Sequence, residues 1–205
     1  MKKSIIFCVV TLIALAGIAQ KNKQEVKLTA DQLQVMVDTI PTKEGKILYD
    51  RIVYVDSSKK QAALYNDIRK WFVENFNSGK AVIQVDDIAN GTLIGKGSYK
   101  YFIVNGMNTH EGYTYFIVNV IVKDGKFRYQ VYQFEAEDEN KSMFANSYDR
   151  GIKSKVDMDV CYTDYKEGKS KKLNRKNLEQ MVTCQYEIDK TMAEMITKKD
   201  NASNF

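Results

Sequence analysis

The stretch that decides the fold is Tyr113–Glu135, which reads YTYFIVNVIVKDGKFRYQVYQFE. Two segments rich in β-branched and aromatic residues flank Asp124-Gly125, a dipeptide typical of two-residue hairpin turns. We therefore predict two antiparallel strands, Tyr113–Lys123 and Lys126–Glu135, joined by this turn. Because a two-residue loop fixes which residues face each other, the turn also predicts the register of the hairpin.

The predicted register places different chemistry on the two faces of the hairpin. One face is apolar and should pack against helices; its facing pairs are Val122 with Phe127, Val120 with Tyr129, and Val118 with Val131. The second face mixes aromatic residues, amides and one arginine; its pairs are Ile121 with Arg128, Asn119 with Gln130, Ile117 with Tyr132, and Tyr115 with Phe134. A mixed face of this kind suits contact with a partner or with another segment of the chain.

Alternating and helical patterns extend the domain toward the N-terminus. The periodicity predicts a strand from Lys46 to about Asp56 and an amphipathic helix over about 59–76, with N-cap candidates in Asp56-Ser57-Ser58 and a C-terminal cap at Gly79. A strand at Ala81–Val85 follows, and then Thr92–Val104 as either one long strand or a bent pair. A polar loop at Asn105–Gly112 holds the single histidine, His110.

The two ends of the chain are less regular. Residues 20–45 form a lead-in that either adds a strand or short helix to the domain or stays mobile. Residues 141–173 contain a candidate helix at Ser142–Tyr148 and a candidate strand at Val156–Tyr162. A second amphipathic helix follows the 3.6-residue period from an N-cap at Asn174 to about residue 197. The order strand, helix, four strands, helix predicts an α+β fold with helices on one sheet face.

The first nineteen residues predict export. Lys2 and Lys3 precede the apolar run Ile5–Ala16, and small residues stand at Gly17 and Ala19, as in a secretory signal peptide cleaved near Ala19/Gln20. No cysteine stands directly after the cleavage site to carry a lipid, so we predict a periplasmic or extracellular product without a stable membrane anchor. The predicted divisions are a signal peptide at 1–19, the lead-in at 20–45, a core at 46–140 and a C-terminal extension at 141–205.

Composition narrows the function classes. Without Lys2 and Lys3 the chain has 29 basic and 26 acidic residues, and this near balance, together with export, argues against nucleic-acid binding. Two cysteines remain after cleavage, Cys161 and Cys184, and they are either a disulfide or two independent buried thiols. With two cysteines and one histidine, the sequence predicts no standard zinc site, and we expect no cofactor.

A family resemblance supports the fold. It rests on Ile40-Pro41-Thr42, Gly45-Lys46-Ile47, the helix residues Leu64-Tyr65-Asn66, Trp71-Phe72 and Phe76, and the pattern Gly91-Thr92, Ile94-Gly95-Lys96-Gly97. From Ile40 to about Glu135 the chain resembles an exported domain family of unknown function with a TATA-binding-protein-like (TBP-like) fold. The resemblance implies a curved antiparallel sheet backed by helices and an envelope location. It implies no catalytic residues and no binding to DNA.

Two surfaces are candidates for binding. The first is the mixed sheet face, where Tyr115, Ile117, Asn119, Arg128, Gln130 and Tyr132 would contact an envelope protein or glycan. The second is a basic patch before the last helix, formed by Lys169, Lys171, Lys172 and Arg175, which is either an anion-binding surface or a solvated loop.

Three functions remain open at this stage. We favour a noncatalytic binding module that uses the mixed face. One alternative is a small envelope hydrolase that uses His110 or a carboxylate pair from Asp86-Asp87, Glu135–Glu139, or Asp157 with Asp159. A structural envelope protein without a ligand is another. An exposed mixed face would support the first, whereas a pocket that gathers His110 with an acid and a hydroxyl would support the second.

Overall fold

The computed structural model describes residues 28–76, 83–105, 108–139 and 153–197, without the side chains of 103–105, 108–110, 138–139 and 153–154. The predicted signal peptide, the candidate helix at Ser142–Tyr148 and the predicted cap at Gly79 lie outside these residues. Among the helices that are described, none combines the length and the apolar character needed to cross a membrane.

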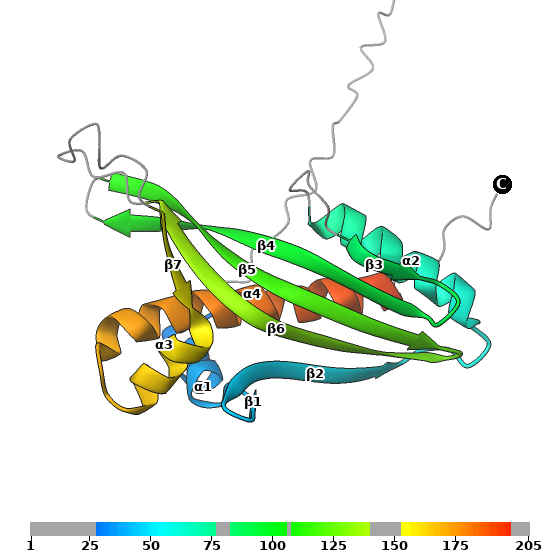
Figure 1. Cartoon of the computed structure of the whole chain (residues 1–205), viewed down its shortest axis with the longest axis horizontal. Helices are drawn as coiled ribbons and strands as arrows, with labels where there is room; N and C mark the ends of the chain where they lie inside the picture. Colours follow the sequence, from blue (N-terminus) through cyan, green and yellow to red (C-terminus); the bar gives the residue numbers. More distant parts are fainter. Residues whose placement is uncertain (1–27, 77–82, 106–107, 140–152, 198–205) are drawn as a thin grey trace, which may run out of the picture.

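The described strands form one antiparallel sheet of seven strands in the order β1-β2-β6-β5-β4-β3, with β7 pairing β6 beyond the end of β2 (Figure 1). The strands are β1 Thr42–Lys43, β2 Lys46–Tyr54, β3 Ile83–Asp87, β4 Thr92–Asn105, β5 Asn108–Lys123, β6 Lys126–Glu139 and β7 Lys153–Asp157. Strand β6 therefore has β5 along one edge and two successive partners, β2 and β7, along the other edge.

Four helices complete the described fold: α1 Ala30–Asp38, α2 Gln61–Asn75, α3 Met158–Lys166 and α4 Lys171–Thr197. Helix α4 runs behind the long strands, and α2 lies beside β3 (Figure 1). The predicted α+β class, with an antiparallel sheet and helices on one face, is confirmed. The predicted order β-α-β-β-β-β-α is present as β2-α2-β3-β4-β5-β6-α4, with α1 and β1 before it and with β7 and α3 before α4.

The apolar hairpin face is the centre of the core, as its register predicts. Six predicted pairs are confirmed: Val122 with Phe127, Val120 with Tyr129, Val118 with Val131, Ile121 with Arg128, Asn119 with Gln130, and Ile117 with Tyr132. The first three pairs are buried in one cluster with apolar residues of all four helices. Helix α2 and its C-cap residue contribute the predicted apolar residues Leu64, Ile68, Trp71, Phe72 and Phe76 to this cluster. Helix α4 contributes Leu178, Met181, Val182, Ile188 and Met192.

The predicted pairing of Tyr115 with Phe134 is wrong. A β-bulge shifts the register between Ile117 and Tyr115, so Tyr115 faces Glu135 instead. Gln133 takes a left-handed backbone conformation, with φ of 54°, and is the residue that the bulge inserts. The insertion turns Phe134 into the core, where its side chain is 1% exposed.

The start of α2 also differs from prediction, because its cap comes from a distant turn. The N-cap residue is Lys60, whose side chain makes no capping bond, and not one of Asp56-Ser57-Ser58. The Gln61 backbone N–H instead donates to Asp124 Oδ1 at 2.8 Å, and Lys60 pairs with the same carboxylate at 3.2 Å. The hairpin turn thus fixes both the register of the sheet and the beginning of a helix.

Other strand and loop boundaries differ from the predicted ones by a few residues. Strand β2 ends at Tyr54, and β3 runs two residues further than expected, to Asp87. The predicted polar loop at Asn105–Gly112 is wrong from Asn108 onward, because β5 begins there and His110 pairs with Ile103 of β4. In the lead-in, both a short helix and a short strand are present, and Thr29 and Gln32 form a capping box at the start of α1.

The last third of the chain departs most from the sequence patterns. Residues 158–162 are helical and not a strand, because Asp157 ends β7 and caps α3 by accepting a hydrogen bond from the Asp159 N–H at 2.8 Å. Asn174 is not an N-cap: it lies inside α4, is nearly buried, and donates through Nδ2 to the Lys169 carbonyl at 2.9 Å.

Cys161 and Cys184 are free, buried thiols. Burial raises the pKa of Cys161 to about 11 and raises that of Cys184 well above its usual value. Because the thiolate is the reactive form, both residues should react slowly in the folded protein.

We expect Ellman's reagent to label fewer than one thiol of the native protein within minutes and two thiols in 6 M guanidinium chloride without reductant, apart from any Cys8 that remains. These numbers follow from the two buried thiols of the described chain. Recovery of the two thiols only after reduction would contradict the free state and would indicate a disulfide.

Candidate binding face

The mixed face predicted from the sequence lies on the side of the sheet opposite the helices. Its six residues come from adjacent positions on β5 and β6: Tyr115, Ile117, Asn119, Arg128, Gln130 and Tyr132. Arg128 is exposed and the other five are partly buried, whereas the alternate residues of both strands are buried. No helix of the described chain covers this side. We call it the open face.

The open face continues onto the neighbouring strands. Asp50 and Ile52 of β2 stand next to Gln130 and Arg128, and Ile94 and Lys96 of β4 stand next to Asn119 and Ile117. Exposed apolar side chains are scattered over it, including Ile52 and Tyr54 on β2 and Phe102 on β4.

Two of the six residues are bound by an aspartate of β2. Arg128 Nε donates to Asp50 Oδ1 at 2.8 Å, its Nη2 pairs with Asp50 Oδ2, and Gln130 Nε2 donates to Asp50 Oδ2 at 3.2 Å. The hydrogen bonds from Arg128 are the largest cause that holds the pKa of Asp50 below its usual value; burial opposes them, and the hydrogen bond from Gln130 adds a smaller lowering effect. The arginine is therefore part of a fixed polar cluster on the open face.

The Asp50 cluster makes stability depend on pH in a defined direction. A carboxylate whose pKa falls on folding stabilises the protein above its unfolded pKa and loses this effect as the pH drops through the folded value. We expect Asp50→Asn to lower the free energy of unfolding at pH 6, and the difference from wild type to shrink steadily below pH 3.8, the usual carboxyl value.

Urea unfolding of both proteins between pH 2.5 and 7 measures this difference. Arg128→Gln should produce the same flattening of the acid part of the curve, because it removes the other half of the pair. A constant difference across the pH range would show that Asp50 contributes through packing and not through its charge.

A cavity of about 570 Å³ opens on this face where β6 bulges. Three of the six predicted residues line it: Tyr115, Ile117 and Tyr132. The carboxylates Glu135, Asp157 and Asp159, which the sequence offered as acidic pairs, also line it. Residues without a predicted role complete the wall: Lys46, Lys96, Gln133 and Lys155, with the buried Ile47, Phe116 and Phe134 and with Gly97. We call this space the bulge cavity; its volume is in the range of small-molecule sites.

The strand pairing explains why the cavity forms at this place. The pairing of β2 with β6 ends at Leu48 and Tyr132, and that of β7 with β6 begins at Asp157 and Glu135. In the described sheet, this edge of β6 is thus unpaired at Gln133 and Phe134, where Gln133 has its left-handed backbone. A backbone held in a sparsely populated conformation is common at binding sites.

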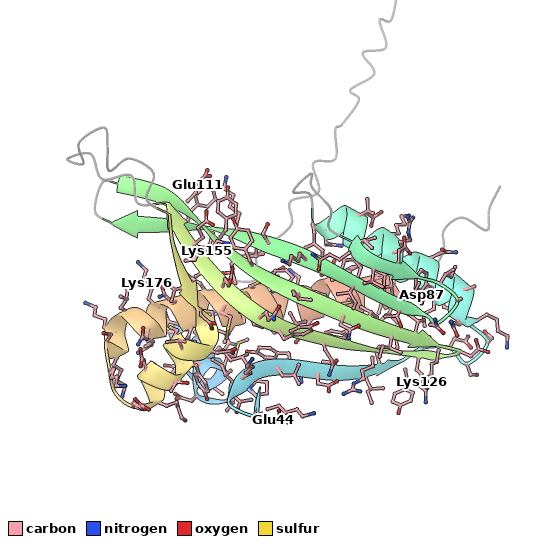
Figure 2. All side chains as sticks on the ribbon, in the orientation of Figure 1. Glu44, Asp87, Glu111, Lys126, Lys155 and Lys176 are labelled. Carbon is pink, nitrogen blue, oxygen red and sulfur yellow. The ribbon has the colours of Figure 1, made fainter. Side chains whose placement is uncertain are left out.

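The acidic groups of the cavity are held by the chain itself. Asp159 Oδ1 accepts a hydrogen bond from the Ile47 N–H at 2.7 Å, and Asp157 Oδ1 caps α3. Glu135 pairs with Lys155 at 3.3 Å, and the Lys155 ammonium lies 5.2 Å from the centre of the Tyr115 ring. Figure 2 shows Lys155 next to the long strands.

The structure separates the six predicted residues into two groups. Tyr115, Ile117 and Tyr132 meet at the bulge cavity, whereas Arg128 and Gln130 belong to the Asp50 cluster. Asn119 lies between them, and its Oδ1 is buried without a hydrogen-bond partner in the described part of the chain. One sequence signal for the bulge exists: buried residues of β6 alternate as Phe127, Tyr129 and Val131, and then Phe134 breaks the alternation by one position.

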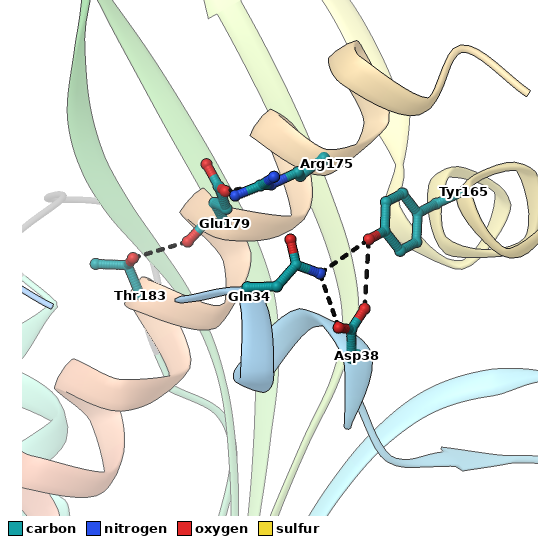
Figure 3. A network of polar contacts seen from close by, with 6 residues as sticks. All are labelled: Gln34, Asp38, Tyr165, Arg175, Glu179 and Thr183. Atoms are coloured by element: carbon teal, nitrogen blue, oxygen red, sulfur yellow. Dashed lines mark hydrogen bonds and ion pairs between the residues drawn. The ribbon is translucent and has the colours of Figure 1, made fainter. Parts of the chain in front are cut away.

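The predicted basic patch is partly neutralised. Lys169 pairs with Glu167 and Asp164, at 2.5 and 3.6 Å, and Arg175 pairs with Glu179 at 2.7 Å (Figure 3). Lys171 lies over the Tyr165 ring, and Lys172 is exposed.

A polar cluster beside this patch joins two helices. Tyr165 of α3 donates to Asp38 of α1 at 3.3 Å, and Gln34 of α1 donates to the Tyr165 hydroxyl at 3.1 Å and to Asp38 at 2.8 Å (Figure 3). These bonds hold α1 against α3, which gives the surroundings of the patch a structural role.

Of the residues considered for hydrolysis, Glu135, Asp157 and Asp159 meet at the bulge cavity, whereas Asp86 of β3 does not line it. The side chain of His110 lies outside the described atoms, and no histidine, serine or cysteine is among the residues that line the bulge cavity. Asp86, from one predicted carboxylate pair, accepts hydrogen bonds from Tyr65 and Arg69 at 2.7 and 2.8 Å. Within the described ranges, no group of three metal-binding side chains occurs.

Comparisons with known proteins agree on the fold. Residues 49–137 match a family described as a domain of unknown function (DUF4468) with TBP-like fold. A DUF4468 family protein from Bacteroides ovatus is 16% identical, with a TM-score of 0.58 over 79% of this chain and 92% of that one. A TBP-like protein from Parabacteroides distasonis is 10% identical, with a TM-score of 0.54 over 76% and 94%. No curated protein matches the chain.

Proposed function

We propose that this chain, whose residues 49–137 match a domain family of unknown function with TBP-like fold, is an exported, noncatalytic binding module. Its open face holds an envelope protein or a glycan, and the bulge cavity is the centre of the contact. The N-terminal sequence Met1–Ala19 supports export to the periplasm or the cell exterior.

The observation that carries this proposal is the position of the cavity. It opens on the side of the sheet that the described helices leave uncovered, and it is lined by Tyr115, Ile117 and Tyr132, three of the residues that the sequence assigned to this face. Tyrosine and isoleucine side chains at its wall offer rigid, partly apolar contact area, as recognition surfaces do.

Capture from an envelope extract of the native cells tests the proposal. Immobilised wild-type protein should recover a partner that the double variant Tyr115→Ala/Tyr132→Ala does not recover. The two substitutions remove both aromatic rings from the cavity wall. Ile121→Ala is the matched control, because Ile121 is an apolar residue of the same face and strand and does not line the cavity. Thermal unfolding of the three proteins establishes that they are folded.

Equal recovery of every partner by wild type and the double variant would overturn the cavity as the site. Loss of the same partner from the Ile121→Ala protein would show that the contact is spread over the sheet and is not centred on the bulge.

A further inference from the structure

The positive charge available in the bulge cavity is that of two lysines. Lys46 on β2 and Lys96 on β4 both line it, and neither forms an ion pair within the described chain. The third lysine, Lys155, is shared between Glu135 and the Tyr115 ring. The two aspartates accept backbone hydrogen bonds at or beside the start of α3, where the helix dipole offsets part of their charge. Lys46 and Lys96 are therefore the charged side chains of the cavity wall that have neither an ion-pair nor a hydrogen-bond partner in the described chain.

The two lysines lie at opposite sides of the cavity. Lys96 pairs in register with Ile117, Ile117 with Tyr132, and Tyr132 with Leu48, so this row crosses from β4 to β2. Lys46 is two residues from Leu48 on β2. Three strand spacings separate the two strands, which is about 14 Å between their backbones. A ligand that meets both ammonium groups is elongated and carries negative charge at more than one point.

The floor between the lysines favours a ligand with flat, weakly polar faces. Ile117 and Tyr132 lie in the row itself, and Tyr115 lies beside it. Pyranose rings present such faces, with C–H groups that pack on aromatic rings and hydroxyls around the rim. The Gln133 side chain, and the unpaired β6 edge at Gln133 and Phe134, can supply hydrogen bonds to those hydroxyls.

The same edge argues against an extended acidic peptide. A peptide that adds to a sheet needs a run of unpaired strand, because its affinity comes from main-chain hydrogen bonds. Here β2 and β7 leave only Gln133 and Phe134 between their pairings with β6.

We infer that the bulge cavity binds an acidic oligosaccharide, a short chain of sugars that carry carboxylates, with Lys46 and Lys96 on the carboxylates and the tyrosines under the rings. The inference rests on the proposed binding function and names its ligand class.

Calorimetric titration of the whole protein with trigalacturonate tests the ligand class, with two matched probes beside it. A neutral galactose trisaccharide has the rings without the charge, and triglutamate has the charge without the rings. We expect trigalacturonate to bind at least tenfold more tightly than either probe, and its affinity to fall as salt is added. Equal binding of the neutral sugar would overturn the role of the lysines, and equal binding of triglutamate would overturn the role of the rings.

Variants of the two lysines test the contact. Lys46→Gln and Lys96→Gln should each weaken trigalacturonate binding about tenfold, the effect of losing one charged hydrogen bond. Because neither lysine has an ion-pair partner in the described chain, neither change should disturb folding. Lys123→Gln is the control, since Lys123 lies at the far end of β5 near the hairpin turn.

The outcomes separate this inference from the proposed function. If trigalacturonate does not bind and extract capture still depends on Tyr115 and Tyr132, the ligand class is wrong and the binding face stands. If trigalacturonate binds and Lys46→Gln and Lys96→Gln leave its affinity unchanged, the sugar binds elsewhere and the inference is overturned.

Discussion

Phe116→Ala will cost about 3–5 kcal/mol of the free energy of unfolding, the range for removing a fully buried phenylalanine. Phe116 is 2% exposed and lies where β5, β6 and α2 meet. Its ring centre is 5.4 Å from that of Phe76 and 6.1 Å from that of Phe134. Because Phe134 enters the core only through the bulge, losing Phe116 leaves a void directly beneath the bulge cavity.

Urea unfolding measures this loss, and Phe102→Ala is its control. Phe102 is an aromatic residue of the neighbouring strand β4 with 63% of its surface exposed, so its truncation should cost a small fraction of the same energy. Similar losses for both variants would mean that Phe116 is not the anchor of the core at the bulge.

Gly97→Ala will cost about 1–3 kcal/mol, the usual effect of overpacking a filled core. A Cβ at Gly97 would lie 2.4 Å from Phe116 Cε2 and 3.1 Å from Phe76 Cδ1. The Phe116 ring cannot retreat, since Phe76 and Phe134 pack against it.

A double-mutant cycle tests the cause of the Gly97 effect. In the Phe116→Ala background the added methyl enters the space that the ring has left, so Gly97→Ala should be nearly neutral or stabilising there. An equal cost in both backgrounds would mean that the glycine is needed for its backbone and not for the close approach of Phe116.

The parts of the fold that followed from the sequence are those set by local pattern. The Asp124-Gly125 turn and the alternation around it gave six correct facing pairs, and the spacing from Leu64 to Phe76 gave α2. Both patterns involve residues that are close in the chain, so they predict local structure without information on long-range contacts.

The features that the sequence did not predict depend on contacts between residues far apart in the chain. The cap of α2 is Asp124, which is 63 residues from the Gln61 N–H that it accepts. The Asp50 cluster joins two strands that are 78 residues apart, and only the pairing of β2 with β6 brings Arg128 to that carboxylate. No pattern within one segment contains this information.

The candidate site was predictable only in part, because it combines residues of the hairpin with residues of distant strands. The hairpin register placed Tyr115, Ile117 and Tyr132 on one face, but Lys46, Lys96 and Lys155 come from three other strands. The cavity itself depends on the bulge at Gln133, whose only trace in the sequence is the shifted position of Phe134. Strict alternation predicts a Phe134–Tyr115 pair on the open face, but the bulge places Phe134 in the core and leaves the cavity open.

Photocrosslinking in the native cells tests the central claim, that the bulge cavity is the binding site. A photoreactive benzoylphenylalanine placed at Tyr132 should form a crosslinked product with a protein or glycan on irradiation, because this position lines the cavity. The same group placed at Val73, an exposed position of α2 on the helical side of the sheet, should form none. A product of equal yield at Val73, or no product at Tyr132, would contradict the claim.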